Sequence, residues 1–116
     1  MNKSSKSKSG INSWPEDDRP REKLLKKGPE TLSNSELLAI LLRTGTKGLS
    51  AISLARMILD KFGTFRNMAH TDSREWRDFK GLGDAKLAHI KSALEIGRRF
   101  REDEISQKKI KISSAK

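Results

Sequence analysis

The residues best suited to chemistry form one short segment, KGLGDAK, in which Lys80, Gly81, Leu82 and Gly83 separate two helical patterns and Lys86 follows. Glycine adopts backbone angles that other residues resist, so a G-h-G sequence, where h is apolar, predicts a tight reversal between the two helices. The first amides of the second helix would then be unpaired and would lie at the positive end of the helix dipole. Such a helix start can bind a phosphate, with Lys80 and Lys86 placed to contact neighbouring phosphates.

The same segment also has a purely structural interpretation, as a tight turn inside a helical bundle with its leucine plugged into the core. Asp84 stabilises a helix start, but its negative charge opposes a bound phosphate. The sequence therefore indicates nucleic-acid backbone binding and leaves a packing role open. The predicted DNA-binding residues are Lys80, Gly81, Leu82, Gly83 and Lys86.

Other reactive groups are sparse. The chain has no cysteine, and its two histidines, His70 and His89, lack the spacing expected of metal ligands. The acids Glu16, Asp17 and Asp18 cluster in a polar segment, where a solvated turn is expected, and no G-x-S-x-G nucleophile motif occurs. We therefore expect no catalytic residue, no metal ligand, no cofactor and no small-molecule substrate, and no enzyme activity from this chain alone.

The positive charge is concentrated at the two ends of the chain. The formal net charge is +10, yet residues 1–13 and 108–116 contain seven lysines and no acidic residue. Residues 14–107 contain 18 basic and 15 acidic residues, so bulk basicity is weak evidence for a nucleic-acid partner. The lack of cysteine suits a cytoplasmic location, and no stretch is long enough to span a membrane.

Helical periodicity dominates the chain after residue 20 and predicts an all-α fold, a small bundle of five to six short helices. Ser33 and Glu36 form a capping box ahead of a helix that begins at Asn34 and ends near Thr44, where Gly45 can take the left-handed conformation. This helix is apolar around most of its circumference, so we expect it to be the most buried element. Further helices are predicted at 20–27, 51–62, 65–69, 73–79 and 84–102, with caps at Ser50, Thr64 and Asp72 with Glu75, and with Leu24 and Leu25 facing the core.

Three parts of the chain follow from these patterns. Residues 1–13 are expected to form a disordered basic tail, and residues 14–104 a helical domain that contains a helix-hairpin-helix motif. Residues 105–116 lose the helical pattern and alternate briefly at Ile110 and Ile112, which indicates a linker or the start of a second domain absent from this chain.

Three segments in the same order resemble the amino-terminal region of the RadC family of bacterial proteins. They are RPREKLLKKG (19–28), LSNSELLAILLRTGTKG (32–48) and KGLGDAKLAHIKSALEIGRR (80–99). The resemblance implies a helix-hairpin-helix domain of the SAM-like, RuvA domain 2-like type in a protein described as a DNA repair protein. It also implies a following JAB/MPN-type metalloprotease-like domain with a zinc site of the H-x-H…D pattern. That pattern does not occur in this chain, so zinc is expected only in the absent domain.

Two functional hypotheses follow. The first is a DNA-binding module without sequence specificity, in which the hairpin amides and lysines contact backbone phosphate. The alternative is a protein-interaction or scaffold domain that docks a protein partner or the absent metalloprotease-like domain. Neither hypothesis involves a membrane.

Overall fold

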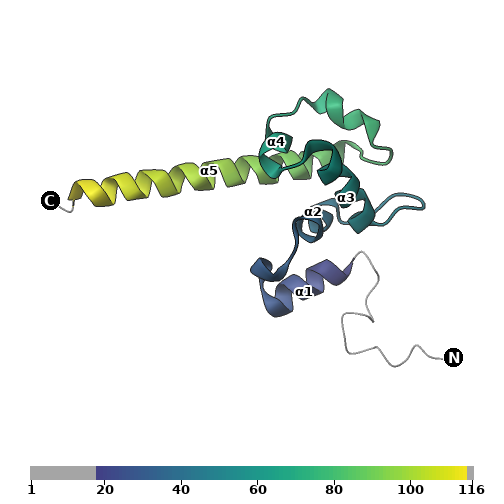
Figure 1. Cartoon of the computed structure of the whole chain (residues 1–116), viewed down its shortest axis with the longest axis horizontal. Helices are drawn as coiled ribbons and strands as arrows, with labels where there is room; N and C mark the ends of the chain where they lie inside the picture. Colours follow the sequence, from purple (N-terminus) through teal and green to yellow (C-terminus); the bar gives the residue numbers. More distant parts are fainter. Residues whose placement is uncertain (1–17, 115–116) are drawn as a thin grey trace.

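The computed structural model describes residues 18–114 as a small helical bundle from which one long helix projects (Figure 1). The elements are α1 (Arg19–Lys27), η4 (Pro29–Thr31), α2 (Asn34–Leu42), α3 (Ala51–Phe62), α4 (Phe65–Ala69), η5 (Ser73–Asp78) and α5 (Asp84–Ser114). These residues contain no strand, and one isolated bridge joins Thr46 to Leu49. The predicted all-α fold is confirmed, whereas the predicted tail at 1–13 lies outside the described residues.

Local capping signals determine where the helices begin. The Ser33 hydroxyl accepts a hydrogen bond from the Glu36 amide at 3.1 Å, and the Glu36 carboxylate accepts one from the Ser33 amide at 2.8 Å. Ser50 and Thr64 cap α3 and α4 in the same way, through the amides three residues later. These three predicted starts are confirmed, because each depends only on residues within one turn.

The predicted cap at Asp72 and Glu75 is also a capping box, but it opens a 3₁₀ helix, η5, in place of an ordinary α-helix. Its Trp76 is buried and stacks against Phe62 of α3 with ring centroids 4.6 Å apart. Phe79 completes this aromatic cluster, 6.2 Å from the Phe62 ring. The cluster fixes the segment that leads into α5 against α3.

The core is centred on α3, whereas the sequence predicted α2 as the most buried element. Three residues of α2 are buried, compared with five of α3. The outer side of α2 is covered only in part, which leaves Leu37, Ile40 and Leu41 partly exposed. The buried cluster consists of Leu38, Ala39, Leu42, Ala51, Leu54, Ala55, Ile58, Phe62, Met68, Trp76, Phe79 and Ile90.

The register of α1 differs from the prediction. Leu25 is 73% exposed, while Glu22 is buried and only 5% exposed. The Lys23 ammonium lies 3.3 Å from the Glu36 carboxylate and so ties α1 to α2. Because successive residues lie about 100° apart around a helix, Leu25 falls on the side of α1 opposite Lys23, and its predicted place in the core is wrong.

The long helix α5 runs to Ser114, past the predicted end near Glu102 and through the alternation at Ile110 and Ile112 that indicated a linker or the start of a second domain. Within it, Arg98 pairs with Glu95 at 2.8 Å and with Glu102 at 2.7 Å. Such pairs support a helix without an apolar stripe, so the loss of periodicity marks the end of packing and not the end of the helix. None of the helices between residues 18 and 114 combines the length and apolarity needed to cross a bilayer.

Candidate nucleic-acid interface

The turn between η5 and α5, residues 79–83, reverses the chain within a few residues. Gly81 has φ +82°, a left-handed value that favours glycine. The Leu82 amide donates to the Phe79 carbonyl at 3.2 Å, and the Leu82 side chain packs half-buried against the core. The turn is therefore anchored by its leucine, while Lys80, Gly81 and Gly83 remain exposed.

The 79–83 turn packs against a second glycine-containing loop, residues 43–49, which joins α2 to α3. A Cβ atom at Gly81 would overlap the methyl group of Thr46. Thr46 and Leu49 exchange two backbone hydrogen bonds of 2.8 and 2.9 Å, and a Cβ atom at Gly45 would overlap the Leu49 carbonyl oxygen. Glycine is thus required at both points of close approach, and we call residues 43–49 and 79–84 together the two-loop face.

The end of α2 lies at the base of this face and differs from the prediction that Gly45 takes the left-handed conformation. The helix ends at Leu42, and Arg43 itself has φ +70°. The Thr44 amide then donates to the Leu42 carbonyl at 2.8 Å. Gly45 has an ordinary negative φ, and its lack of a side chain serves the close backbone approach instead.

Lys86, one of the predicted phosphate ligands, is directed toward the end of α2. Its ammonium donates to the Leu42 carbonyl at 2.7 Å and to the Thr44 hydroxyl at 3.0 Å. A cation at the C-terminus of a helix satisfies unpaired carbonyls and interacts favourably with the dipole. Lys86 therefore joins α5 to α2 and holds the two loops in register.

Two further lysines also donate to backbone carbonyls of neighbouring segments. Lys91 of α5 donates to the Thr71 carbonyl at 2.6 Å, just beyond α4. Lys61 of α3 donates to the Glu75 carbonyl at 3.0 Å and pairs with Asp78 at 2.8 Å at the end of η5. Because these lysines already have partners within the bundle, fewer cations remain to bind an external partner.

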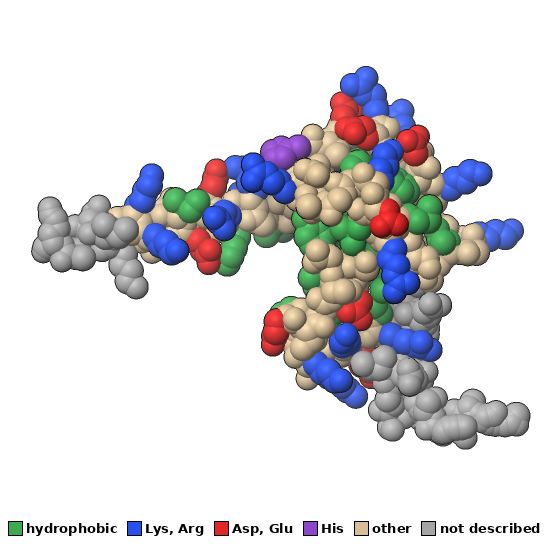
Figure 2. Space-filling model, in the orientation of Figure 1, with side chains coloured by type: hydrophobic (Ala, Val, Ile, Leu, Met, Phe, Trp, Pro, Cys, Tyr) green, Lys and Arg blue, Asp and Glu red, His purple; other side chains and the backbone are tan. Residues whose placement is uncertain are grey.

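Three cations on the two-loop face have no such contact. Arg43, Lys47 and Lys80 are exposed, and no described residue forms a hydrogen bond or ion pair with their side chains. Figure 2 shows Lys and Arg side chains projecting from the side of the bundle on which Figure 1 places both loops. Asp84, close to Lys80 in the sequence, has an exposed carboxylate whose negative charge opposes these cations.

The first amides of α5 also lie on this face. The first bond into the helix runs from the Leu87 amide to the Gly83 carbonyl at 3.1 Å. Within the part of the chain that the structure describes, no group accepts a hydrogen bond from the amides of residues 83–86. The two adjoining segments therefore offer four free donors and three exposed cations, the groups that can bind an anionic backbone.

The predicted site residues thus separate into two groups. Lys80, Gly81, Leu82 and Gly83 form one turn, whereas the ammonium of Lys86 lies against α2. Sequence reasoning missed Arg43 and Lys47, because their loop meets the turn only through the fold. The signal that could have found them is the spacing of Gly45 and Gly48 around Lys47, since paired glycines mark backbone that approaches another segment closely.

Residues 18–114 contain no cluster of three or more His, Cys, Asp or Glu side chains able to hold a metal ion. The zinc site that the RadC resemblance implies has no ligand set in this part of the chain. What the described residues expose at the two-loop face is a set of backbone amides and side-chain cations.

Comparison with known proteins identifies close relatives. The family described as UPF0758 N-terminal matches residues 11–88. The chain is 48% identical over 97 residues to a UPF0758 protein of Aeromonas salmonicida, covering 84% of this chain and 44% of that protein. It is 50% identical over 93 residues to a UPF0758 protein of Geotalea uraniireducens, covering 78% of this chain and 41% of that protein.

The chain spans less than half the length of these relatives. A UPF0758 protein of Aeromonas hydrophila gives the same picture, with 47% identity over 97 residues and 43% of its length covered. No solved structure matches the chain.

Proposed function

Because the chain belongs to the UPF0758 N-terminal family and its motifs resemble those of a family described as DNA repair proteins, we propose that the two-loop face binds DNA. In this proposal the 79–83 turn and the helix start act as a helix-hairpin-helix motif. The free amides of residues 83–86 bind one backbone phosphate, and Lys80 contacts the next. No base is read, so binding is independent of sequence.

The observation that carries the proposal is the contact between the two loops. It brings the loop that bears Arg43 and Lys47 against the turn that bears Lys80, so the three cations and the four free amides belong to adjoining segments. Asp84 offsets one of these charges and keeps the expected affinity modest. Lys86 contributes indirectly in this arrangement, because it fixes the start of α5 against α2.

The relatives are longer than this chain, and the proposal extends to a whole protein of their kind. This helical domain would deliver a following metalloprotease-like domain, with its own zinc, to DNA or to a repair intermediate in the cytoplasm. The domain itself would need no cofactor and would carry no catalytic residue. A role in protein interaction is the second candidate, supported by the apolar side chains that α5 exposes, namely Ile96, Phe100, Ile105 and Ile110.

The test is a titration of labelled duplex and branched DNA, read by fluorescence anisotropy at about 50 and 200 mM salt. Three phosphate contacts predict a salt slope near −2.7 and a loss of about 40-fold in affinity between these concentrations. The changes Lys80→Met, and Arg43→Gln with Lys47→Gln, should reduce the slope by about one and two respectively, whatever the DNA sequence.

The matched control is Arg56→Gln, which removes an exposed cation of α3 that has no partner among the described residues. Its affinity and slope should equal those of the parent protein. Equal losses in the control and the two-loop variants would mean that binding follows net charge alone, and the proposed interface would be wrong.

A further inference from the structure

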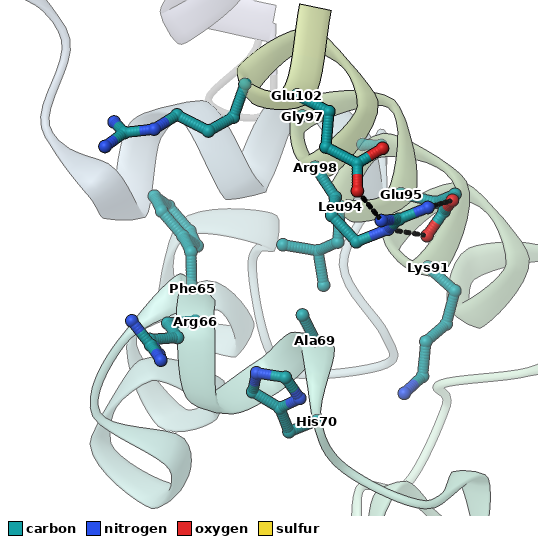
Figure 3. A pocket seen from close by; sticks show the side chains of 12 residues that line it. Phe65, Arg66, Ala69, His70, Lys91, Leu94, Glu95, Gly97, Arg98 and Glu102 are labelled. Carbon is teal, nitrogen blue, oxygen red and sulfur yellow. Dashed lines mark hydrogen bonds and ion pairs between the residues drawn. The ribbon is translucent and has the colours of Figure 1, made fainter. Parts of the chain in front are cut away.

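A second surface feature lies on the other side of the bundle, where α4 crosses α5. The two helices leave an open groove with a volume of about 1020 Å³, enough for several side chains of a partner. Figure 3 shows Phe65 of α4 and Leu94 of α5 pointing into the space between the helices. Both side chains are half-buried against the core, so the groove has an apolar floor fixed by the fold.

Three small residues are among those that line the groove. Ala69 of α4 and Ala93 and Gly97 of α5 line it. Gly97 lies in the middle of α5, where glycine is among the poorest helix formers. Its φ is not positive, and a Cβ atom there would meet nothing within 4 Å. No packing among the described residues therefore requires a glycine, but its absence of a side chain leaves room for a second backbone to approach.

The rim of the groove carries unsatisfied positive charge. Arg98 is held by Glu95 at 2.8 Å and by Glu102 at 2.7 Å, as the dashed lines in Figure 3 mark. Arg66 on α4 and Arg101 on α5 are exposed and have no partner among the described residues. Both acids of the groove are thus already paired, and two free guanidinium groups remain on opposite walls.

From this geometry we propose that the α4–α5 groove docks an amphipathic helix of a partner protein, with apolar side chains on Phe65 and Leu94 and flanking carboxylates on Arg66 and Arg101. An apolar floor with a basic rim complements a helix whose apolar stripe is bordered by acids. The docking site uses none of the residues of the two-loop face. It therefore adds a protein-interaction function that stands or falls independently of DNA binding.

A peptide helix fits the groove better than single-stranded nucleic acid does. The lining of α5 spans residues 91–102, about 17 Å at 1.5 Å per residue, which matches roughly three turns of a docked helix. Proteins that hold single strands stack successive bases on several aromatic side chains. Phe65 is the one Phe, Tyr or Trp side chain among the residues that line this groove, and the three small residues in the lining leave room for close helix approach.

The probes are a panel of peptides of about 15 residues, with Leu, Ile, Phe or Met at the i, i+3, i+4 and i+7 positions and Glu on both flanks. The same panel with Lys in place of Glu tests charge, and an oligothymidine tests nucleic acid. Binding is read from backbone amide shifts of the isotopically labelled protein. We expect acidic peptides to shift the amides of residues 65–70 and 91–102, and the lysine versions to leave them unchanged.

Substitutions in the groove separate docking from folding. Reversing both rim charges, Arg66→Glu with Arg101→Glu, should weaken acidic peptides at least about tenfold. The control makes the same charge change elsewhere, Arg56→Glu with Lys108→Glu, and should bind normally. Gly97→Leu should block the groove, while Gly97→Ala should raise the melting temperature and reduce affinity, since it favours the helix but removes space.

Three outcomes would overturn the proposal. The first is equal binding of acidic and basic peptides at the groove. The second is a groove shift with oligothymidine and none with acidic peptides, which would make the surface a nucleic-acid site. The third is no groove shift with any acidic peptide at about 1 mM, a concentration that detects even weak complexes.

Discussion

The contact between Lys86 and the end of α2 leads to the sharpest prediction about the interface. Changing Lys86 to Met preserves most of the aliphatic stem but removes the hydrogen bonds to the Leu42 carbonyl and the Thr44 hydroxyl, at 2.7 and 3.0 Å. If the ammonium is a helix clamp, the variant should lose stability. If it is mainly a phosphate ligand, stability should remain and DNA binding should fall.

The magnitude follows from the bonds that are lost. A hydrogen bond from a charged group contributes about 1.5–3 kcal/mol, and a cation at a helix C-terminus adds about 0.3–1 kcal/mol. The Leu42 carbonyl still accepts from the Thr44 amide at 2.8 Å, so no carbonyl is left without a partner. We therefore take the lower end, about 1.5–2 kcal/mol, which corresponds to a fall of roughly 6–16 °C in melting temperature for a domain of this size.

The assay is urea and thermal unfolding followed by circular dichroism at 222 nm, with Lys80→Met as the matched control. Lys80 is exposed and has no partner among residues 18–114, so its variant should lie within about 0.5 kcal/mol of the parent protein. DNA affinity is then measured where both variants are folded. We expect a several-fold loss for Lys80→Met and a smaller, indirect loss for Lys86→Met. A Lys86→Met protein of unchanged stability that no longer binds DNA would refute the assignment of Lys86 to a structural clamp.

Two other predictions concern the contacts that shape the domain. Gly81→Ala should destabilise the protein by at least about 2 kcal/mol in urea unfolding, because a left-handed alanine costs about 1–2 kcal/mol and its Cβ overlaps the Thr46 methyl group. Adding Thr46→Gly should recover the steric part and leave the backbone part, whereas full recovery would contradict the strained φ. The pKa of Glu36 is held below its ordinary value of 4.5, chiefly by the hydrogen bond from the Ser33 amide. The stability that ionised Glu36 contributes is therefore complete above pH 4.5 and is lost as the pH falls through the lowered pKa. The urea midpoints of the parent protein and of Glu36→Gln should differ at neutral pH and become equal at acid pH. A difference between the two midpoints that stays constant with pH would exclude this role.

The helix starts could be predicted because their signals are local. A hydroxyl or carboxylate three residues before its amide partner, as at Ser33, Ser50 and Thr64, determines the cap without help from the rest of the fold. The end of α5 had no such signal. Arginine and glutamate pairs continue the helix after the apolar stripe stops, so apolar periodicity located the packed part of α5 and missed the projecting part.

The candidate site could be predicted only in part, because its second half is not contiguous in sequence. The glycines around Leu82 indicate a turn, but no feature of the local sequence predicts that Thr46 packs against Gly81. Likewise, a lysine one turn into a helix can face solvent or a neighbouring helix. The orientation of Lys86 depends on where α2 ends, which is a property of the whole bundle.

The internal use of lysine changes how the charge of this domain should be weighed. Lys86 and Lys91 each donate to a carbonyl at or just beyond a helix end, and Lys61 donates to the Glu75 carbonyl within η5, so all three stabilise the bundle and are withheld from an anionic partner. Around the turn, Lys80 is then the lysine that remains free. A single lysine beside Asp84 gives almost no net attraction for a phosphate backbone, so the turn alone is a poor DNA site. Any affinity for DNA must come from the neighbouring loop as well, and the RTGTKG segment should matter to binding as much as the KGLG turn.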